Sequence, residues 1–150
     1  QYTDDYEEFT VPSYWPTNPG DQRFWYYHLL QYLGQTTQVF ICPSAPDQGR
    51  GTMGYTNMGY GWNFRWLTQK GGTTYGVPTA TLVDIKSPSD TIATADSLGN
   101  LDYVIYWHTL GTNYCPDHRH SNMAVFGFID GHADRMPYPA SIVQSHWDLQ

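Results

Sequence analysis

The sequence predicts an α+β fold with an antiparallel β-sheet, one short helix in the N-terminal region and a C-terminal β-hairpin. Three observations predict it: short apolar runs end at Pro or at Asp-Gly, a single stretch has helical spacing, and 14 Gly and 10 Pro supply many turns. The 150 residues are the size of one ordinary domain, and no linker or repeat divides them. We therefore predict a single domain over residues 1–150.

The first elements are an extended arm and a helix. Residues 11–20 contain three prolines, which exclude a helix there. A helix is then expected from Gln22 to Leu33, because apolar residues recur at helical spacing, with Asp21 as its N-cap and Gly34 as its stop.

Four further runs in the middle of the chain are predicted to be strands, and the Gly-rich stretch 49–61 is predicted to be a loop or irregular strand. The strands are Val39–Cys42, ended by Pro43; Trp62–Trp66, in which Trp62, Phe64 and Trp66 alternate on one face; Thr91–Asp96; and Tyr103–His108.

The C-terminal part carries the clearest local pattern. Residues 123–129 are apolar on both faces and predict a buried strand. Asp130-Gly131 follows, a strong signal for a two-residue hairpin turn, and residues 132–136 would return as the partner strand. This turn would pair Ile129 with His132 and Gly127 with Asp134.

Composition limits the classes of function. The net charge is -7, which argues against a nucleic-acid partner, since a phosphate backbone needs a basic face. Aromatic residues are 17% and charged residues only 14%, the reverse of a disordered chain. No apolar run is long enough to span a bilayer, and the acidic opening is not a signal peptide. We expect a processed or truncated piece of a longer protein.

Four sequence pieces, taken in order, resemble the large bacterial pseudopilin family marked by a His, nine residues and then Asp-Gly near the C-terminus. The opening Tyr2–Tyr6 resembles the point where the long N-terminal helix of such proteins ends, and the predicted first helix also fits. The pieces are Val39-Phe40-Ile41-Cys42-Pro43-Ser44, then Pro88-Ser89-Asp90-Thr91 running to Ala95-Asp96-Ser97, then Arg119-His120, then Asp130-Gly131-His132.

The resemblance implies the head of a pilin-like subunit of a type II secretion or pilus machinery, which functions in protein transport. Its partners would be other pseudopilin subunits and the secretion machinery. The head would lie in the periplasm or at the cell surface, and the full-length precursor would be anchored in the inner membrane by an N-terminal helix that precedes this sequence. We expect no enzyme and no obligatory cofactor.

Histidines and aspartates near the C-terminus invite a metal or catalytic interpretation. We favour structural roles instead: His120 would fix a strand entrance and Asp130 would supply turn chemistry, about 30 Å apart along a straight strand. Calcium is a second hypothesis, because some related major pseudopilins hold it in a C-terminal loop. In this sequence the candidate ligands would be Asp96, Asp130 and Asp134. Zinc at His118 and His120 would need two more ligands, which the spacing does not supply.

Two more hypotheses concern cysteines and aromatics. Cys42 and Cys115 could form a disulfide in an oxidising compartment, could be unrelated thiols, or Cys42 could pair with a cysteine upstream. The alternation of Trp62, Phe64 and Trp66 could make a platform that stacks on sugar rings, so a carbohydrate-binding module with polysaccharide as partner is the rival function. The alternative for these rings is a place in the core.

Overall fold

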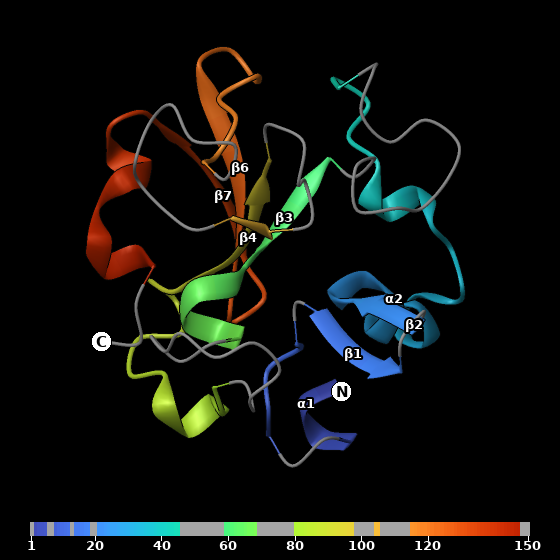
Figure 1. Ribbon diagram of the computed structural model, residues 1–150. Coiled ribbons are helices and arrows are strands. Elements are labelled where there is room, and N and C mark those ends of the chain that lie inside the picture. Colours follow the sequence, from blue (N-terminus) through green and yellow to red (C-terminus); the bar gives the residue numbers. More distant parts are fainter. Residues whose placement is uncertain are drawn as a thin grey trace.

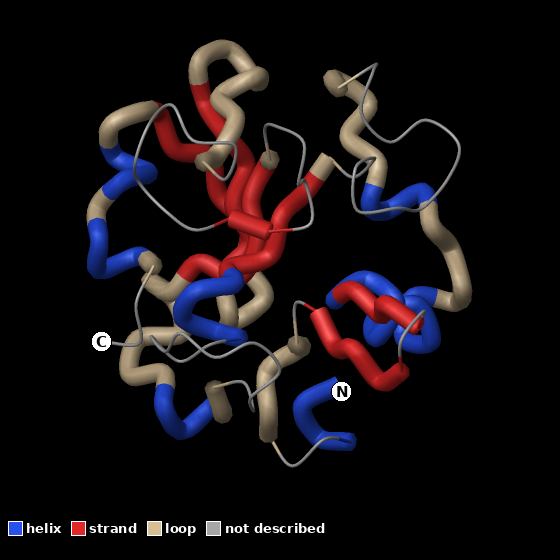
Figure 2. The backbone as a smooth tube through the Cα atoms, in the orientation of Figure 1, coloured by secondary structure: helices blue, strands red, loops and turns tan. Residues whose placement is uncertain are grey.

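A computed structural model describes residues 2–5, 8–12, 14–18, 21–45, 59–68, 80–97, 104–105 and 115–147. The chain combines short helical turns with two β-sheets (Figures 1 and 2). In chain order the elements are α1 (Tyr2–Asp5), β1 (Tyr14–Asn18), β2 (Asp21–Phe24), α2 (Trp25–Leu29), η1 (Leu30–Leu33), η2 (Gln38–Phe40), β3 (Tyr60–Asn63), η3 (Phe64–Thr68), η4 (Leu82–Asp84), β4 (Ile92–Asp96), β5 (Val104–Ile105), β6 (Met123–Phe128), β7 (Ala133–Pro137), η5 (Ala140–Ile142) and η6 (Gln144–His146).

The larger sheet has five strands in the order β5-β3-β4-β6-β7. Strands β3, β4, β6 and β7 pair in that order, each antiparallel to the next. Strand β5 pairs with β3 in parallel. This arrangement confirms the mixed α+β class. No helix among the described residues is long and apolar enough to cross a bilayer.

The N-terminal region differs from the prediction at its start. The extended arm becomes β1, which pairs with β2 in a two-stranded sheet beside the main one (Figure 1). The predicted start of the helix at Gln22 is therefore wrong, because cross-strand pairing takes residues 21–24 into β2. The helical path begins only at Trp25, without a side-chain cap, and Gly34 ends it in the left-handed conformation at φ 62°, as predicted.

Two predicted strands in the middle of the chain are also corrected. Residues 38–40 form a 3₁₀ turn, so Val39–Cys42 is not a strand. After β3 the chain coils into η3, a single π-helical turn, instead of continuing to Trp66 as a strand. The buried side chain of Asn63 stands at that change, because its Oδ1 accepts a hydrogen bond from the Trp66 N–H at 3.5 Å. Residues 49–58, which belong to the predicted loop or irregular strand, and most of Tyr103–His108 lie outside the described residues.

The C-terminal hairpin is present, with a register one residue away from the prediction. Gly127 pairs with Ala133 instead of Asp134. The turn holds three residues, since Phe128 donates to the His132 carbonyl at 2.9 Å and Gly131 donates back to the Phe128 carbonyl at 3.0 Å. Gly131 has φ 92°, the left-handed residue that three-residue hairpin loops require.

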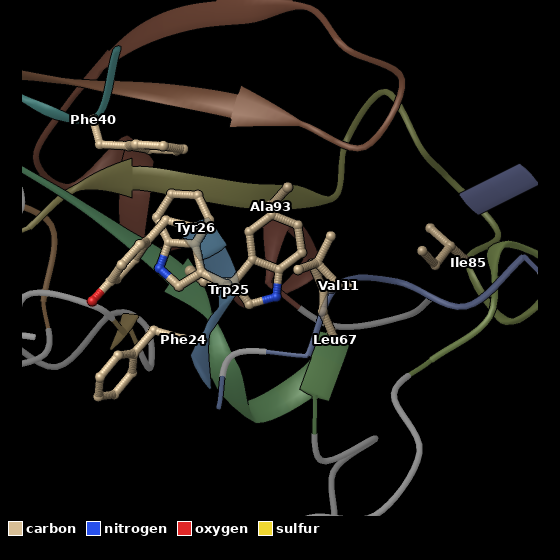
Figure 3. Close-up of a cluster of buried hydrophobic side chains, with 9 residues drawn as sticks. Val11, Phe24, Trp25, Tyr26, Phe40, Leu67, Ile85 and Ala93 are labelled. Atoms are coloured by element: carbon tan, nitrogen blue, oxygen red, sulfur yellow. The ribbon is translucent and has the colours of Figure 1, made fainter. Parts of the chain in front are cut away.

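Two clusters of buried apolar side chains pack against the sheet. One cluster joins the N-terminal elements to the sheet, because Trp25 stacks on Trp62 of β3 with 5.6 Å between the ring centroids. Trp25 also meets Phe40 edge-on at 5.4 Å (Figure 3). A second cluster contains Phe126 of β6 and Trp147 near the C-terminus. Strand β4 contributes to both clusters, so it is the centre of the fold.

Candidate functional site

Three side chains from distant parts of the sequence meet at one end of the sheet: Cys42, Asp96 and His120. The Nε2 atom of His120 lies 3.3 Å from Oδ2 of Asp96 and 3.5 Å from Sγ of Cys42. One potential ligand atom from each residue lies within 4.8 Å of the other two. Cys42 and Asp96 are buried, whereas the His120 side chain is 25% exposed, so the cluster meets solvent on the histidine side.

Each of these side chains is fixed by its backbone. Asp96 is the last residue of β4, and its Oδ2 accepts a 2.7 Å hydrogen bond from the N–H of Val125 in the adjacent strand. His120 and Met123 exchange backbone hydrogen bonds of 3.0 and 3.1 Å. Between them Ser121 and Asn122 both have positive φ, at 56° and 63°, as a type I′ turn requires. This turn aims His120 back toward β4.

Cys42 follows η2 and lies against the backbone at Gly59. A Cβ atom added at Gly59 would stand 2.6 Å from the Cys42 Cβ and 2.7 Å from its nitrogen. Only glycine permits this approach. Gly59 also donates to the Phe40 carbonyl at 3.2 Å, which connects the segment before Cys42 to the one entering β3.

Arg119 ties the surrounding segments together. Its Nη2 donates to the Ser97 carbonyl at 2.6 Å and to the Gly59 carbonyl at 3.2 Å. Its Nε lies 2.9 Å from Oδ2 of Asp117 and 3.8 Å from Oδ1 of Asp96. The guanidinium therefore bridges backbone and carboxylates next to the cluster.

The electrostatics follow from burial. Burial raises the pKa of Asp96, although the Val125 N–H and the neighbouring Arg119 and His120 favour its charged form. Burial, together with electrostatic interactions with Cys42 and Asp96 and a hydrogen bond with Cys42, raises the pKa of Tyr60 to about 12. Tyr60 therefore stays neutral at the edge of the cluster. The Oδ1 atom of Asp96 is buried and has no hydrogen-bond partner among the described residues.

The cluster does not have the layout of a catalytic triad. In a triad the carboxylate holds one ring nitrogen of the histidine and the nucleophile faces the other. Here Asp96 and Cys42 both face Nε2 of His120. The three groups instead converge on one point, which suits a shared hydrogen bond or a bound metal ion.

The other predicted site residues lie elsewhere. Asp130 is in the hairpin turn, where its Oδ1 accepts hydrogen bonds from His132, at 3.1 Å from the backbone N–H and at 2.6 Å from Nδ1. Asp134 is exposed on β7. Asp96 lies at the opposite end of β6 from Asp130, so the three proposed calcium ligands do not share a site within the described part of the chain.

The structure also bears on the histidine pair and on the three alternatives for the cysteines. His118 forms a 2.9 Å hydrogen bond through Nε2 with the buried Ser141 hydroxyl and is not part of the cluster. Cys42 and Cys115 are both buried free thiols, so the structure contains no bond between them. Pro43 is exposed beside Cys42.

The proposed sugar platform is not formed. Trp62 and Phe64 are buried at 8% and 5% exposure, and Trp66 is partly buried against the second apolar cluster. The reason is the turn into η3, which breaks the alternation that would have placed the three rings on one face. These rings fill the core.

Sequence reasoning named Cys42, Asp96 and His120 one by one but did not join them. They are separated by 54 and 24 positions along the chain, and no local pattern reports such a contact. The signal that was available is their membership of three of the four pieces that carry the family resemblance. Comparisons with protein-family models, with curated proteins and with solved structures find no match to this chain.

Proposed function

We propose that this chain is the head of a structural subunit of a pseudopilus or pilus-like filament in a bacterial secretion system, where it acts through contacts between subunits. The observation that carries the proposal is the position in the fold of the residues from the four sequence pieces. Cys42, Asp96 and Arg119-His120 meet in one bonded cluster at one end of the sheet. Asp130-Gly131 forms the turn at the other end.

These positions give the residues structural roles, which suits the subunit of a filament. Residues that carry the resemblance connect backbone segments or form turns. The Arg119 side chain alone contacts the carbonyls of two segments and two carboxylates. A subunit that must keep its shape under the load of a filament needs such connections.

The N-terminal contacts also support the proposal. The resemblance expects the long helix of such subunits to end near Tyr2–Tyr6, and α1 is helical over Tyr2–Asp5. The Tyr2 ring meets the Tyr32 ring at 5.9 Å, and the Tyr32 hydroxyl donates to Asp5 at 2.7 Å. A helix that entered the head through α1 would be held against η1 by these contacts. We place the head in the periplasm or at the cell surface, with secretion machinery as its partner.

The test is to look for this head in filaments. The natural gene product, with any upstream coding sequence, is expressed in its own bacterium, filaments are sheared off and sedimented, and the pellet is probed with an antibody against residues 1–150. We expect the antigen to sediment with the filaments. Recovery of the antigen only as a slowly sedimenting monomer, from cells that assemble filaments, would contradict the proposal.

A further inference from the structure

We propose that Cys42, Asp96 and His120 form a binding site for Zn²⁺, a function separate from filament assembly. The first argument is distance. Ligand atoms at about 2.0 to 2.3 Å from a tetrahedral zinc ion stand about 3.3 to 3.6 Å from one another. The two distances from Nε2 of His120 are 3.3 Å to Asp96 and 3.5 Å to Cys42. Two of the three ligand pairs thus already have the spacing that the ion requires, and the ligand atoms of the third pair, Cys42 and Asp96, lie within 4.8 Å of each other.

The second argument is the chemistry of the ligands. A thiolate, an imidazole and a carboxylate form a sulfur, nitrogen and oxygen set, which suits zinc. Calcium and magnesium take oxygen ligands and would leave the cysteine and the histidine unused. The donor set therefore selects a transition metal over the alkaline earths.

The third argument is charge. With Cys42 as thiolate, the negative charges of Cys42, Asp96 and Asp117 exceed the positive charge of Arg119 by two. A divalent cation cancels that excess.

The fourth argument is access. Three protein ligands leave the fourth position of a tetrahedral ion for water. The partial exposure of the His120 side chain provides a route for the ion and for that water. Bound zinc would join the segment after η2, the end of β4 and the turn before β6, and so it would stabilise the folded state.

The test uses the 150-residue chain without a polyhistidine tag, stripped with a chelator and kept reduced. Zinc is titrated in competition with a chromophoric chelator, and Co²⁺ serves as the spectroscopic probe. We expect one equivalent of metal, a near-ultraviolet thiolate-to-cobalt absorption band, and a zinc-dependent rise in melting temperature that the chelator reverses.

Matched variants locate the site. We expect Cys42→Ser to abolish the thiolate band and His120→Gln to weaken zinc binding at least about tenfold. Cys115→Ser and His118→Gln remove a second buried thiol and a neighbouring histidine outside the cluster, and both should bind like the wild type.

The measurements on the wild-type chain test the zinc proposal even if a variant fails to fold. Absence of the thiolate band and of any rise in melting temperature in the wild-type protein overturns the proposal and leaves a hydrogen-bonded cluster only. A band that survives Cys42→Ser, or one that Cys115→Ser removes, overturns it as well, because the metal would then lie elsewhere.

Discussion

At the residue scale, Gly59 shows how one missing side chain determines the site. Its backbone lies against Cys42, where an added Cβ would come within 2.7 Å of the Cys42 backbone nitrogen. The obstructing atoms belong to a buried, bonded segment and cannot swing away. Replacement by any other residue must therefore shift either Cys42 or the start of β3.

We predict that Gly59→Ala lowers the free energy of unfolding by about 1–3 kcal/mol, the usual cost of overpacking in a close-packed interior. Urea denaturation followed by tryptophan fluorescence measures it. Gly34→Ala is a useful comparison, because an added Cβ there meets nothing within 4 Å and only the positive φ opposes it. An unchanged midpoint for Gly59→Ala would show that the Gly59 backbone and Cys42 are far enough apart to accept an added Cβ.

His118 should make stability depend on pH. Burial lowers its pKa, although the charges of Asp117 and Asp96 act in the opposite direction. The unfolded chain, with a histidine pKa of about 6.5, therefore takes up a proton before the folded chain does. Stability from neutral His118 is complete above about pH 6.5 and is lost as the pH falls from that value toward the lowered pKa of the folded state.

We predict that His118→Gln flattens the dependence of the unfolding free energy on pH between about 7.5 and 5. Glutamine can keep a hydrogen bond to Ser141 without taking up a proton. Urea midpoints at several pH values measure the slope for both proteins. Identical slopes in the wild type and the variant would exclude His118 as the source.

At the element scale, the C-terminal hairpin depends on two adjacent turn residues. Asp130 accepts hydrogen bonds from His132, and these lower the pKa of its carboxyl. Gly131 takes φ 92° with open space around it, so only backbone conformation restricts the choice of residue there. Asp130 thus stabilises the turn by hydrogen bonds, whereas Gly131 supplies its left-handed backbone conformation.

We predict that Gly131→Ala destabilises the hairpin by about 1–2 kcal/mol and that Gly131→Asn costs less, because asparagine tolerates the left-handed region. Hydrogen exchange at the amides of β6 and β7 measures the local effect. Equal protection in both variants and the wild type would mean that the turn does not limit the opening of the hairpin.

How far the sequence predicts the elements depends on which interactions fix them. Strands β4, β6 and β7 and the stop at Gly34 follow from local patterns, and they were predicted to within a residue or two. The start of α2 was not, because residues 21–24 pair with β1, and pairing between strands overrides helix spacing. The turn at Asp130 was placed one residue off, since Asp-Gly fits two loop lengths.

The candidate site was predictable only as separate residues. Asp96 lies at the end of a predicted strand and His120 at the entrance of another, as expected. Their meeting with Cys42 depends on the order of strands in the sheet and on the close approach at Gly59, neither of which leaves a periodic trace in the sequence. The prediction of an aromatic platform was wrong because the chain turns into η3 directly after Asn63, a change of path that the alternation of the aromatic residues does not report.

At the scale of the whole molecule, Asn63 joins the centre of the sheet to the C-terminal segment. Its Nδ2 donates to the Ile92 carbonyl at 2.8 Å and to the Trp147 carbonyl at 3.0 Å. Trp147 is fully buried, meets Phe126 edge-on at 6.2 Å, and donates through its indole N–H to the Ser141 carbonyl at 2.8 Å. The second apolar cluster is therefore closed by the last turns of the chain.

We predict that Trp147→Ala lowers the free energy of unfolding by about 3–5 kcal/mol, through lost burial and a cavity beside Phe126. Asn63→Ala should cost about 1–3 kcal/mol, because two buried carbonyls each lose a donor. The double variant should lose less than the sum, since a C-terminal segment released by the first change no longer offers its carbonyl to Asn63.

Denaturation midpoints for the wild type, the two single variants and the double variant measure the coupling between Asn63 and Trp147. Val143→Ser, in the same segment but 48% exposed, should stay within about 0.5 kcal/mol of the wild type. Strict additivity of the two core changes would show that Asn63 and Trp147 stabilise the fold independently.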